Sequence, residues 1–320
     1  MILGNNSTHY QAILDIGSNS FHFVVYQIEK DKSFSVVLRK RIVYRLALQK
    51  PNEKSFLSED DFTQTEKIIL ELKEVANSFS STITATATSA VREASNQIEF
   101  LERLQKSTGI SVEVLSGERE AALIYKAVLC SEAEALSQNI LCLDIGGGST
   151  EFIVGNNGKI IFVESLKLGA VRLSSKFFPL GDLEKQSIID CRTFIKKEMQ
   201  SVTEKLSLIK VDFVTGNSGT IYAVKNLVVA NAVQLKFEPS DQRVLMRKEI
   251  DKSVELLLTK YGIEERKTLP GVESDRADVL PAGALILQTI FHELNLSKLN
   301  LSEYSMREGK LLEVLESRES

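Results

Sequence analysis

An aspartate followed by three glycines and two hydroxyl residues is the stretch of this sequence best suited to chemistry. It lies in Leu143–Val154 (Leu-Asp-Ile-Gly-Gly-Gly-Ser-Thr-Glu-Phe-Ile-Val), with apolar residues on both sides of its polar centre. This pattern predicts a strand, a tight turn and a second strand, and so a β-hairpin. Glycines let backbone N–H groups approach an anion closely and form a concave nest. Asp144, at the strand end, is placed to hold a cation that would bridge its carboxylate and the bound anion.

A similar stretch occurs earlier in the chain, at Leu14–Val25. Leu14 aligns with Leu143 at an offset of 129 residues, no gap is needed, and seven of the twelve positions are identical. One glycine turn after a strand is explained by an ordinary hairpin, and the similarity could be a coincidence. Two copies with matching apolar flanks favour a duplicated domain, in which two phosphate-binding hairpins face each other across a cleft.

The composition is that of a globular protein and argues against some classes of partner. The chain of 320 residues is long enough for two domains, and it is 43% hydrophobic and 26% charged. A net charge of −4 argues against a general nucleic-acid binder, which would be basic. No apolar run approaches the ~20 residues of a membrane-spanning helix, and Met1–Gln11 lacks a signal-peptide core, so we expect a cytoplasmic protein with no membrane partner.

Three cysteines, Cys130, Cys142 and Cys191, show no spacing typical of a metal site. Cys130 and Cys142 lie among apolar residues. We therefore expect reduced thiols in the protein core rather than ligands or disulfides.

Strands and helices are predicted around both hairpins from hydrophobic periodicity and turn residues. In the first half we expect strands at 12–15, 21–28, 34–43, 81–87 and 112–115. We also expect three helices: one begins after Ser58, a second ends at Gly109, and a third runs from 116 to about 130. In the second half we expect strands at 140–144, 151–154 and 159–166, a strand that begins at 213 and leads into a glycine turn, and a strand at 296–301. Helices are expected after 168, at 183–206, from 221, and at 250–260, 279–294 and 306–317.

Three further places could carry chemistry. Arg92 comes soon after the strand 81–87, so it either enters a cleft or opens the next helix as a surface arginine. Glu120 lies in the first turn of a predicted helix, where acidic residues commonly serve the helix dipole. That explanation covers its neighbour Glu118 well. The segment Gly216–Thr220 is either a plain strand-to-helix loop or a further loop that faces the ligand.

Six motifs in a fixed order resemble the exopolyphosphatase and guanosine pentaphosphate phosphohydrolase family (Ppx/GppA). Single motifs are shared with actin-like ATPases and sugar kinases, whereas their joint order is specific. The motifs are Asp15–His22, Ala90–Ala94, Ser116–Ala121, Asp144–Glu151, Leu168–Leu173 and Arg276–Gly283.

The resemblance implies an α/β protein with a duplicated ribonuclease-H-like fold, that of the actin-like ATPase and sugar kinase superfamily, in two domains around a cleft. Residues 1–128 would form the first domain and 129–302 the second. A C-terminal helix at about 303–320 would pack back on the first domain.

The resemblance also implies Mg²⁺-dependent removal of the terminal phosphate from inorganic polyphosphate or guanosine pentaphosphate, which connects the chain to the stringent response. Glu120 would be the general base for the attacking water, and Arg92, also a catalytic residue, would supply positive charge. Asp144 would hold Mg²⁺, with Glu151 and Asp15 nearby, through water molecules. Phosphate oxygens would be bound by the two turns and one distant arginine, namely by Gly17, Ser18, Asn19, Ser20, Gly146, Gly147, Gly148, Ser149 and Arg276.

Two other functions stay open. An ATP-dependent kinase of the same fold would need an aspartate base near an acceptor pocket, and no such motif is found. A non-catalytic sensor would bind polyphosphate or guanosine pentaphosphate without turnover, and the presence of Glu120 and Asp144 argues against it. The sequence leaves open which of the two substrates is preferred and whether the chain forms a homodimer.

Overall fold

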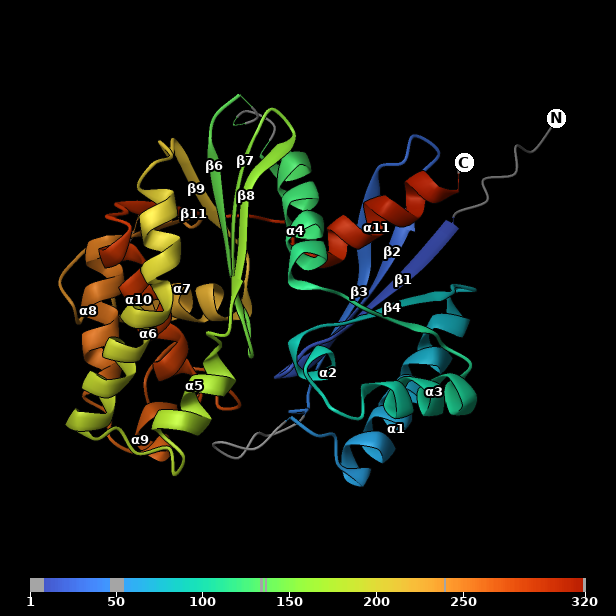
Figure 1. The fold of residues 1–320 in the computed structure, drawn as a ribbon, viewed down its shortest axis with the longest axis horizontal. Coiled ribbons are helices and arrows are strands. Elements are labelled where there is room, and N and C mark those ends of the chain that lie inside the picture. Colours follow the sequence, from blue (N-terminus) through green and yellow to red (C-terminus); the bar gives the residue numbers. More distant parts are fainter. Residues whose placement is uncertain (1–8, 47–54, 133–134, 136, 239, 319–320) are drawn as a thin grey trace. The chain divides into compact units, whose positions relative to one another are not determined.

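The computed structural model of the chain describes residues 9–46, 55–132, 135, 137–238 and 240–318. These residues form two compact units, each built on one mixed β-sheet with helices (Figure 1). The first unit contains the described residues up to Ser116 together with those from Arg307 onward, and the second contains Gly117 to Met306. The boundary between these two contact units falls between Ser116 and Gly117, and the division into domains at 128/129 stays a prediction.

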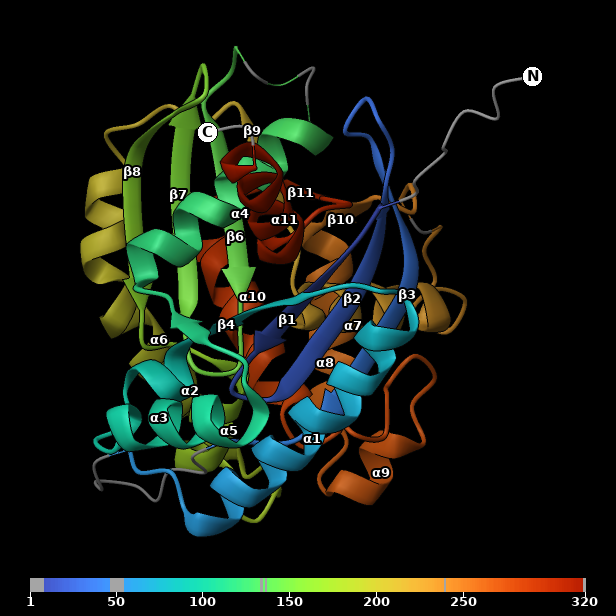
Figure 2. The ribbon, with the colours of Figure 1, turned by 90° about the vertical axis from the view of Figure 1, so that its right-hand side faces the viewer.

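The first sheet has the strand order β3-β2-β1-β4-β5. The strands β1 (His9–Ile16), β2 (Ser20–Ile28) and β3 (Phe34–Val43) are antiparallel neighbours, whereas β4 (Ile83–Ala87) and β5 (Val112–Val114) run parallel to β1. The helices α1 (Glu59–Ser78) and α3 (Gln97–Thr108) cover one face of this sheet, and the single turn α2 (Ser89–Arg92) follows β4 (Figure 2). As predicted, Ser58 caps α1 and Gly109 ends α3 in a left-handed conformation.

The second sheet repeats this order. Its strands β6 (Ile140–Ile145), β7 (Thr150–Asn156) and β8 (Lys159–Leu166) are antiparallel, and β9 (Phe213–Gly216) and β11 (Lys298–Leu301) run parallel to β6. If the five main strands of each unit are numbered along the chain, their spatial order across the sheet is 3-2-1-4-5 in both units. The second strand is antiparallel to the first, and this is the ribonuclease-H-like order. The expected duplicated fold is confirmed, with one addition, the short edge strand β10 (Val244–Met246), which the sequence did not predict.

Two local details repeat as well. Each hairpin turn is closed by the same hydrogen bond, from Gly17 N to Ser20 O at 3.2 Å and from Gly146 N to Ser149 O at 2.9 Å. The pairing of the second and third strands shifts register after Val25 in the first sheet and after Val154 in the second. These positions are related by the offset of 129 residues, so the duplication extends to an irregularity of the strands.

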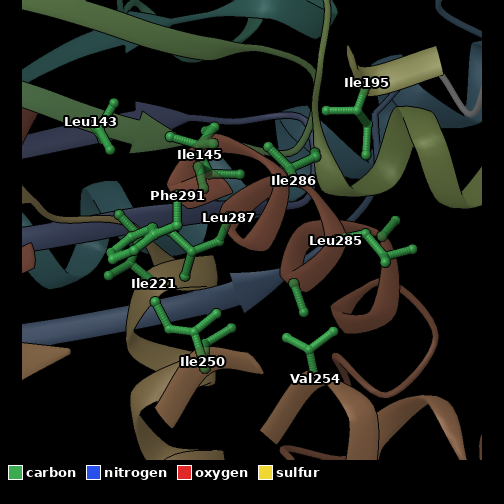
Figure 3. Packing of buried hydrophobic residues seen from close by; sticks show 14 of the residues in the cluster. Leu143, Ile145, Ile195, Ile221, Ile250, Val254, Leu285, Ile286, Leu287 and Phe291 are labelled. Carbon is green, nitrogen blue, oxygen red and sulfur yellow. The ribbon is translucent and has the colours of Figure 1, made fainter. Parts of the chain in front are cut away.

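The larger core lies on one face of the second sheet. It is formed by α5 (Ala170–Phe177), α6 (Lys185–Leu206), α7 (Gly219–Asn231), α8 (Arg247–Leu258) and α10 (Leu280–Glu293). Figure 3 shows Leu143 and Ile145 of β6 among Ile286, Leu287 and Phe291 of α10. Every residue of α10 from Leu280 to Phe291 is buried, which explains why this helix is apolar on all sides. The short helix α9 (Ile263–Lys267) was not predicted.

The other face of each sheet is covered by a helix from the other repeat. The helix α4 (Gly117–Ser131) follows β5 in the chain but packs on β6, β7 and β8 (Figures 1 and 2). Tyr125 of α4 lies against Gly155 of β7. The helix α11 (Met306–Ser317) follows β11 but packs on the first sheet, where Leu311 and Leu315 contact Ile13 and Val24. The two repeats therefore exchange their last helices.

The prediction that all three cysteines are buried in the core is confirmed for two of them only. Cys142 and Cys191 are buried, but Cys130 is exposed. The buried residues of α4 are Ala121, Leu123, Ile124, Tyr125, Ala127 and Val128, and residue 130 falls outside this stripe. Apolar sequence neighbours therefore gave the wrong prediction for Cys130, because the helical period turns its side chain outward.

No helix in the described part of the chain combines the length and the hydrophobicity that a membrane span requires.

Candidate active site

The triple-glycine turn of the second unit is held from behind by the first turn of α5. Backbone N–H groups of α5 donate hydrogen bonds of 3.0 and 2.9 Å to the carbonyl oxygens of Gly146 and Gly147. The guanidinium Nε of Arg172 donates a third bond, of 2.7 Å, to the carbonyl oxygen of Gly148. Three successive carbonyl groups of the turn thus point towards α5.

The N–H groups of the same peptides must point the other way. A trans peptide directs its C=O and N–H to opposite sides, and none of the peptides of the described residues is cis. The N–H groups of Gly147, Gly148 and Ser149 therefore point away from α5. Consecutive N–H groups on one side of a turn form a concave nest that favours phosphate oxygens. That this turn binds phosphate stays a prediction.

The close contact between α5 and the turn depends on Gly169. A Cβ at this position would stand 2.3 Å from the carbonyl oxygen of Gly147 and 2.4 Å from the carbonyl carbon of Gly148. The backbone of Gly169 is extended, with φ −138°, so the requirement for glycine is one of space rather than of conformation. The sequence analysis quoted this residue within the motif Leu168–Leu173 but assigned no role to it.

Acidic side chains gather on the opposite face of the same sheet, the face covered by α4. Asp144, Glu151 and Ser165 are neighbours across β6, β7 and β8. The Ser165 hydroxyl donates a hydrogen bond of 2.8 Å to the carboxylate of Glu151, which is almost fully buried. A Cβ on Gly117 would stand 2.7 Å from the Cβ of Ser165, so the first turn of α4, which carries Glu120, begins beside this row. The structure thus brings the predicted base and two predicted metal ligands to one end of one sheet.

The donor set at this end fits Mg²⁺. The described residues contain no group of three His, Cys, Asp or Glu side chains arranged to hold a metal ion. Mg²⁺ is usually bound by one or two carboxylates, with water molecules and substrate phosphates completing its shell. Asp144 and its cross-strand neighbour Glu151 supply that number of carboxylates beside the nest.

Arg276 lies at a second anion-favouring place of the second unit, the N-terminus of α7. Ser218 caps this helix by accepting a hydrogen bond of 3.1 Å from Ile221 N. A Cβ on Gly219 would stand 2.5 Å from a guanidinium nitrogen of Arg276, so the cation packs directly on the first residue of the helix. Glu273 accepts a bond of 3.0 Å from Arg276 Nε. A guanidinium beside the positive end of a helix dipole favours an anion, so Gly216–Thr220 has the properties of a ligand-facing loop.

The loop that carries Arg276 is itself held by a fully buried arginine. Arg266 donates to the carbonyl oxygen of Ala277 at 2.6 Å and to those of Gly181 and Tyr261 at 2.5 and 2.7 Å. A fourth bond, of 3.0 Å, goes to the carbonyl oxygen of Lys260. Burial lowers the pKa of Arg266, but these four carbonyl partners satisfy its donors. Arg276 is thus placed by a loop with a fixed backbone.

The turn of the first unit has a different set of partners. Arg45 Nε donates a hydrogen bond of 3.0 Å to Asn19 Oδ1, and the Ser20 hydroxyl lies 3.0 Å from His22 Nε2. Ser18 and Ser20 are buried. Side chains rather than a following helix therefore hold this turn in place.

Asp15 occupies the position in the first unit that Asp144 has in the second. Its Oδ2 lies 3.6 Å from a guanidinium nitrogen of Arg307, and its Oδ1 is buried with no hydrogen-bond partner. Burial raises the pKa of Asp15 to about 6, and the nearby Arg307 opposes part of this shift. A buried carboxylate oxygen without a donor is suited to a cation, and the metal role of Asp15 stays a prediction.

Arg92 ends α2 and donates a hydrogen bond of 2.8 Å to the carbonyl oxygen of Leu115. Its side chain is partly buried just past the ends of β4 and β5. The alternative of an exposed surface arginine is therefore not favoured.

The predicted site residues fall into two sets, one in each unit. The first unit carries Asp15, Gly17–Ser20 and Arg92, and the second carries Glu120, Asp144, Gly146–Ser149, Glu151 and Arg276. That the two sets meet across one cleft stays a prediction. The structure adds four residues which the sequence reasoning missed as parts of the site, and these are Arg45, Gly169, Arg172 and Arg307.

Known proteins are similar to this chain over almost its whole length. Residues 24–318 match the sequence model of the Ppx/GppA phosphatase family. The bifunctional 3-dehydroquinate synthase/phosphatase of Fusobacterium nucleatum is 28% identical over 323 residues, which cover 96% of this chain and 47% of that protein. The chain thus spans about half the length of this curated relative.

Solved structures agree with the family match. The crystal structure of the Aquifex aeolicus member of the Ppx/GppA family is 31% identical, with a TM-score of 0.76 over 97% of this chain and 99% of that one. An exopolyphosphatase from Cytophaga hutchinsonii has a TM-score of 0.81 over 97% and 98% of the two chains. It is 23% identical, so it speaks for the fold alone. With a family match that covers both units, this chain belongs to the Ppx/GppA phosphatase family.

Proposed function

We propose that this chain hydrolyses the terminal phosphoanhydride bond of inorganic polyphosphate or guanosine pentaphosphate, with Mg²⁺ as its cofactor. The observation that carries the proposal is the turn Gly146–Ser149, whose carbonyl groups are held by α5 so that its N–H groups are left for an anion. Carboxylates lie at the end of the same strands. Membership of a phosphatase family supports the reaction type.

Glu120 is the proposed general base. Water attacks the terminal phosphorus, the bond from that phosphorus to the bridging oxygen breaks, and the water proton passes to the Glu120 carboxylate. The first turn of a helix stabilises a negative charge, because unpaired N–H groups and the helix dipole point towards it. Glu120 lies in the first turn of α4.

Asp144 and Glu151 are the proposed metal ligands of the second unit, and Asp15 is that of the first. Mg²⁺, when bound, neutralises phosphate charge that builds up as the anhydride bond breaks. The nest of residues 147–149 binds oxygens of the terminal phosphate. Arg276 with the α7 N-terminus, and Arg92 with the turn of the first unit, bind further phosphate oxygens as charge-assisted hydrogen-bond donors.

The deciding experiment measures inorganic phosphate release without any acceptor. Polyphosphate and guanosine pentaphosphate are offered separately at equal concentration, with Mg²⁺ and with excess chelator. We expect steady release from at least one of them in Mg²⁺ and none in chelator, and the ratio of kcat/KM values names the preferred substrate. Binding without release would instead make the chain a sensor, and phosphate transfer that requires both ATP and an acceptor would make it a kinase.

A further inference from the structure

An arginine contacts each phosphate-binding turn at the same place. Asn19 and Gly148 are equivalent residues of the two turns, at the offset of 129. Arg45 Nε donates to the side-chain oxygen of Asn19 at 3.0 Å, and Arg172 Nε donates to the backbone oxygen of Gly148 at 2.7 Å. Each arginine comes from the segment that follows the third strand of its own sheet, β3 or β8. In both turns a guanidinium Nε donates to an amide oxygen, which belongs to a side chain in the first turn and to a peptide in the second.

Both arginines hold the oxygen end of an amide whose nitrogen end is a hydrogen-bond donor. In the second unit this amide is the peptide between Gly148 and Ser149, and its other end is the Ser149 N–H, the last of the three N–H groups in the nest. In the first unit it is the side-chain amide of Asn19, and its other end is the NH₂ group. Since an amide is planar, fixing its oxygen also fixes the direction of its N–H bonds.

We propose that Arg45 and Arg172 are positioning residues that strengthen and orient one phosphate-binding amide in each turn. This inference rests on the proposed function of the turns. A charge-assisted hydrogen bond to the carbonyl oxygen draws electron density from the amide and makes its N–H a stronger donor. The guanidinium groups act through the amides, which contact the phosphate in their place. This action explains why two turns that differ in sequence both have an arginine behind them.

The position of Arg172 allows a clean test. Its backbone N–H donates to the Gly147 carbonyl oxygen at 3.1 Å, and any residue except proline at position 172 can keep that bond. A substitution there removes only the guanidinium and leaves the docking of α5 on the turn. Arg192 and Arg103 are the matched controls, because they lie in the same two units and bond elsewhere, Arg192 to Gln288 and Arg103 to Glu59 and Glu66.

The first measurement is the affinity for methylenediphosphonate, a non-hydrolysable pyrophosphate analogue, by calorimetry in Mg²⁺. We expect Arg172→Met and Arg45→Met each to weaken binding about tenfold, the range of one hydrogen bond to a charged group. Arg172→Lys should recover part of the loss, because an ammonium can donate to the same oxygen. Arg192→Met and Arg103→Met, which remove the same charge, should bind within about twofold of the parent.

The second measurement is the ¹H–¹⁵N signal of the Ser149 amide in the ligand-free protein. It should move upfield in Arg172→Met, since a less polarised N–H is less deshielded, and stay in place in Arg192→Met. Unchanged affinity for methylenediphosphonate in both Arg172→Met and Arg45→Met, or an equal loss of affinity in the two control variants, would overturn the inference.

The inference and the proposed hydrolysis can fail separately. A parent protein that binds methylenediphosphonate but releases no phosphate from either substrate contradicts the hydrolysis, while the affinities still decide the role of the arginines. If the parent releases phosphate and Arg172→Met and Arg45→Met bind the analogue normally, only the positioning role is contradicted. A parent that neither binds the analogue nor releases phosphate would contradict both.

Discussion

Gly169 lies so close to Gly147 that a Cβ on residue 169 would stand 2.3 Å from the Gly147 carbonyl oxygen. The contact joins the start of α5 to the turn between β6 and β7. The helix therefore packs on the carbonyl side of the turn, opposite the N–H groups of the nest. The direction of the N–H groups in the nest is therefore determined by a helix that has no acidic residue of its own.

Replacement of Gly169 by alanine should disturb the nest without unfolding the protein. The extended backbone of Gly169 accepts an alanine, so the only conflict is the added methyl group against the turn. Displacing catalytic groups by about 1 Å can cost about 10²-fold in rate. We expect a loss of that order in kcat/KM for phosphate release, together with weaker binding of methylenediphosphonate.

Gly262→Ala is the control for this substitution. A Cβ at Gly262 would have no neighbour closer than 3.9 Å, and its backbone is also extended. The variant should keep parental activity. Parental activity in Gly169→Ala would show that the turn does not depend on close contact with α5.

Glu120→Gln should remove the base and leave substrate binding nearly intact. General base catalysis contributes about 10²–10⁴-fold, so kcat should fall by that factor in saturating Mg²⁺ while the affinity for methylenediphosphonate stays near the parental value. Glu118→Gln removes the same charge from the same helical turn and should have a small effect on kcat. If Glu120→Gln keeps more than about half of the parental kcat, another group is the base.

Asp144→Asn should weaken metal binding and activity together. The amide keeps the shape of the side chain but loses the charge that holds a hard cation. We expect the Mg²⁺ concentration for half-maximal phosphate release to rise at least about tenfold, because even the loss of a group that only orients a metal ligand typically costs about 10–100-fold in metal affinity. Parental activity in the presence of excess chelator would contradict the metal role of this residue.

The sequence predicted the strands and helices whose periodic hydrophobic pattern is sustained over many residues or whose boundary is marked by turn residues. The strand Phe34–Val43 and the helix Met306–Ser317 were predicted with the bounds that the structure has. Each has a sustained alternating or helical pattern next to turn-forming residues. The strand Val244–Met246 and the helix Ile263–Lys267 were missed, because three or five residues are too few to show a period.

The candidate site was predicted only where a motif marked it. Hairpins with aspartate and glycine were recognisable from residue types alone, but the arginines that contact them were not. Arg45 and Arg307 are single basic residues in ordinary surroundings, and their partners Asn19 and Asp15 lie far away in the chain. Likewise, the apolar stripe of α4 predicts a buried face but does not say which sheet covers it. Information of this kind appears only once the chain is folded.

The three thiols should differ in reactivity. Burial raises the pKa of Cys191 to about 12 and raises that of Cys142 as well, so both stay protonated and shielded at pH 8. Cys130 is exposed. One thiol per chain should therefore react rapidly with a disulfide reagent in the native protein, and three should react in denaturant. Cys130→Ser should abolish the rapid reaction, and rapid labelling of that variant would show that a buried cysteine opens to solvent.

Asp15 should make the protein less stable as the pH rises from about 4 to 6. Its pKa is about 6 in the folded chain and 3.8 without the fold, so the folded state holds the proton more tightly. The stability that comes from this proton is complete below pH 4 and is lost as the pH passes through 6. The difference between the two pKa values corresponds to about 3 kcal/mol of unfolding free energy by pH 7.

Asp15→Asn should cancel this loss, because an amide has no proton to release. In chelator, which removes any bound metal, we expect the variant to exceed the parent in unfolding free energy at pH 7 and to equal it at pH 4, as measured by urea denaturation. Asp31→Asn is the control with the opposite sign, since hydrogen bonds from Ser33 lower the pKa of this exposed carboxyl. Mg²⁺ should then stabilise the parent more than Asp15→Asn, because a bound cation compensates the buried charge that the variant lacks. Equal stability of parent and variant across this pH range would mean that the Asp15 carboxylate is solvated or fully neutralised by Arg307.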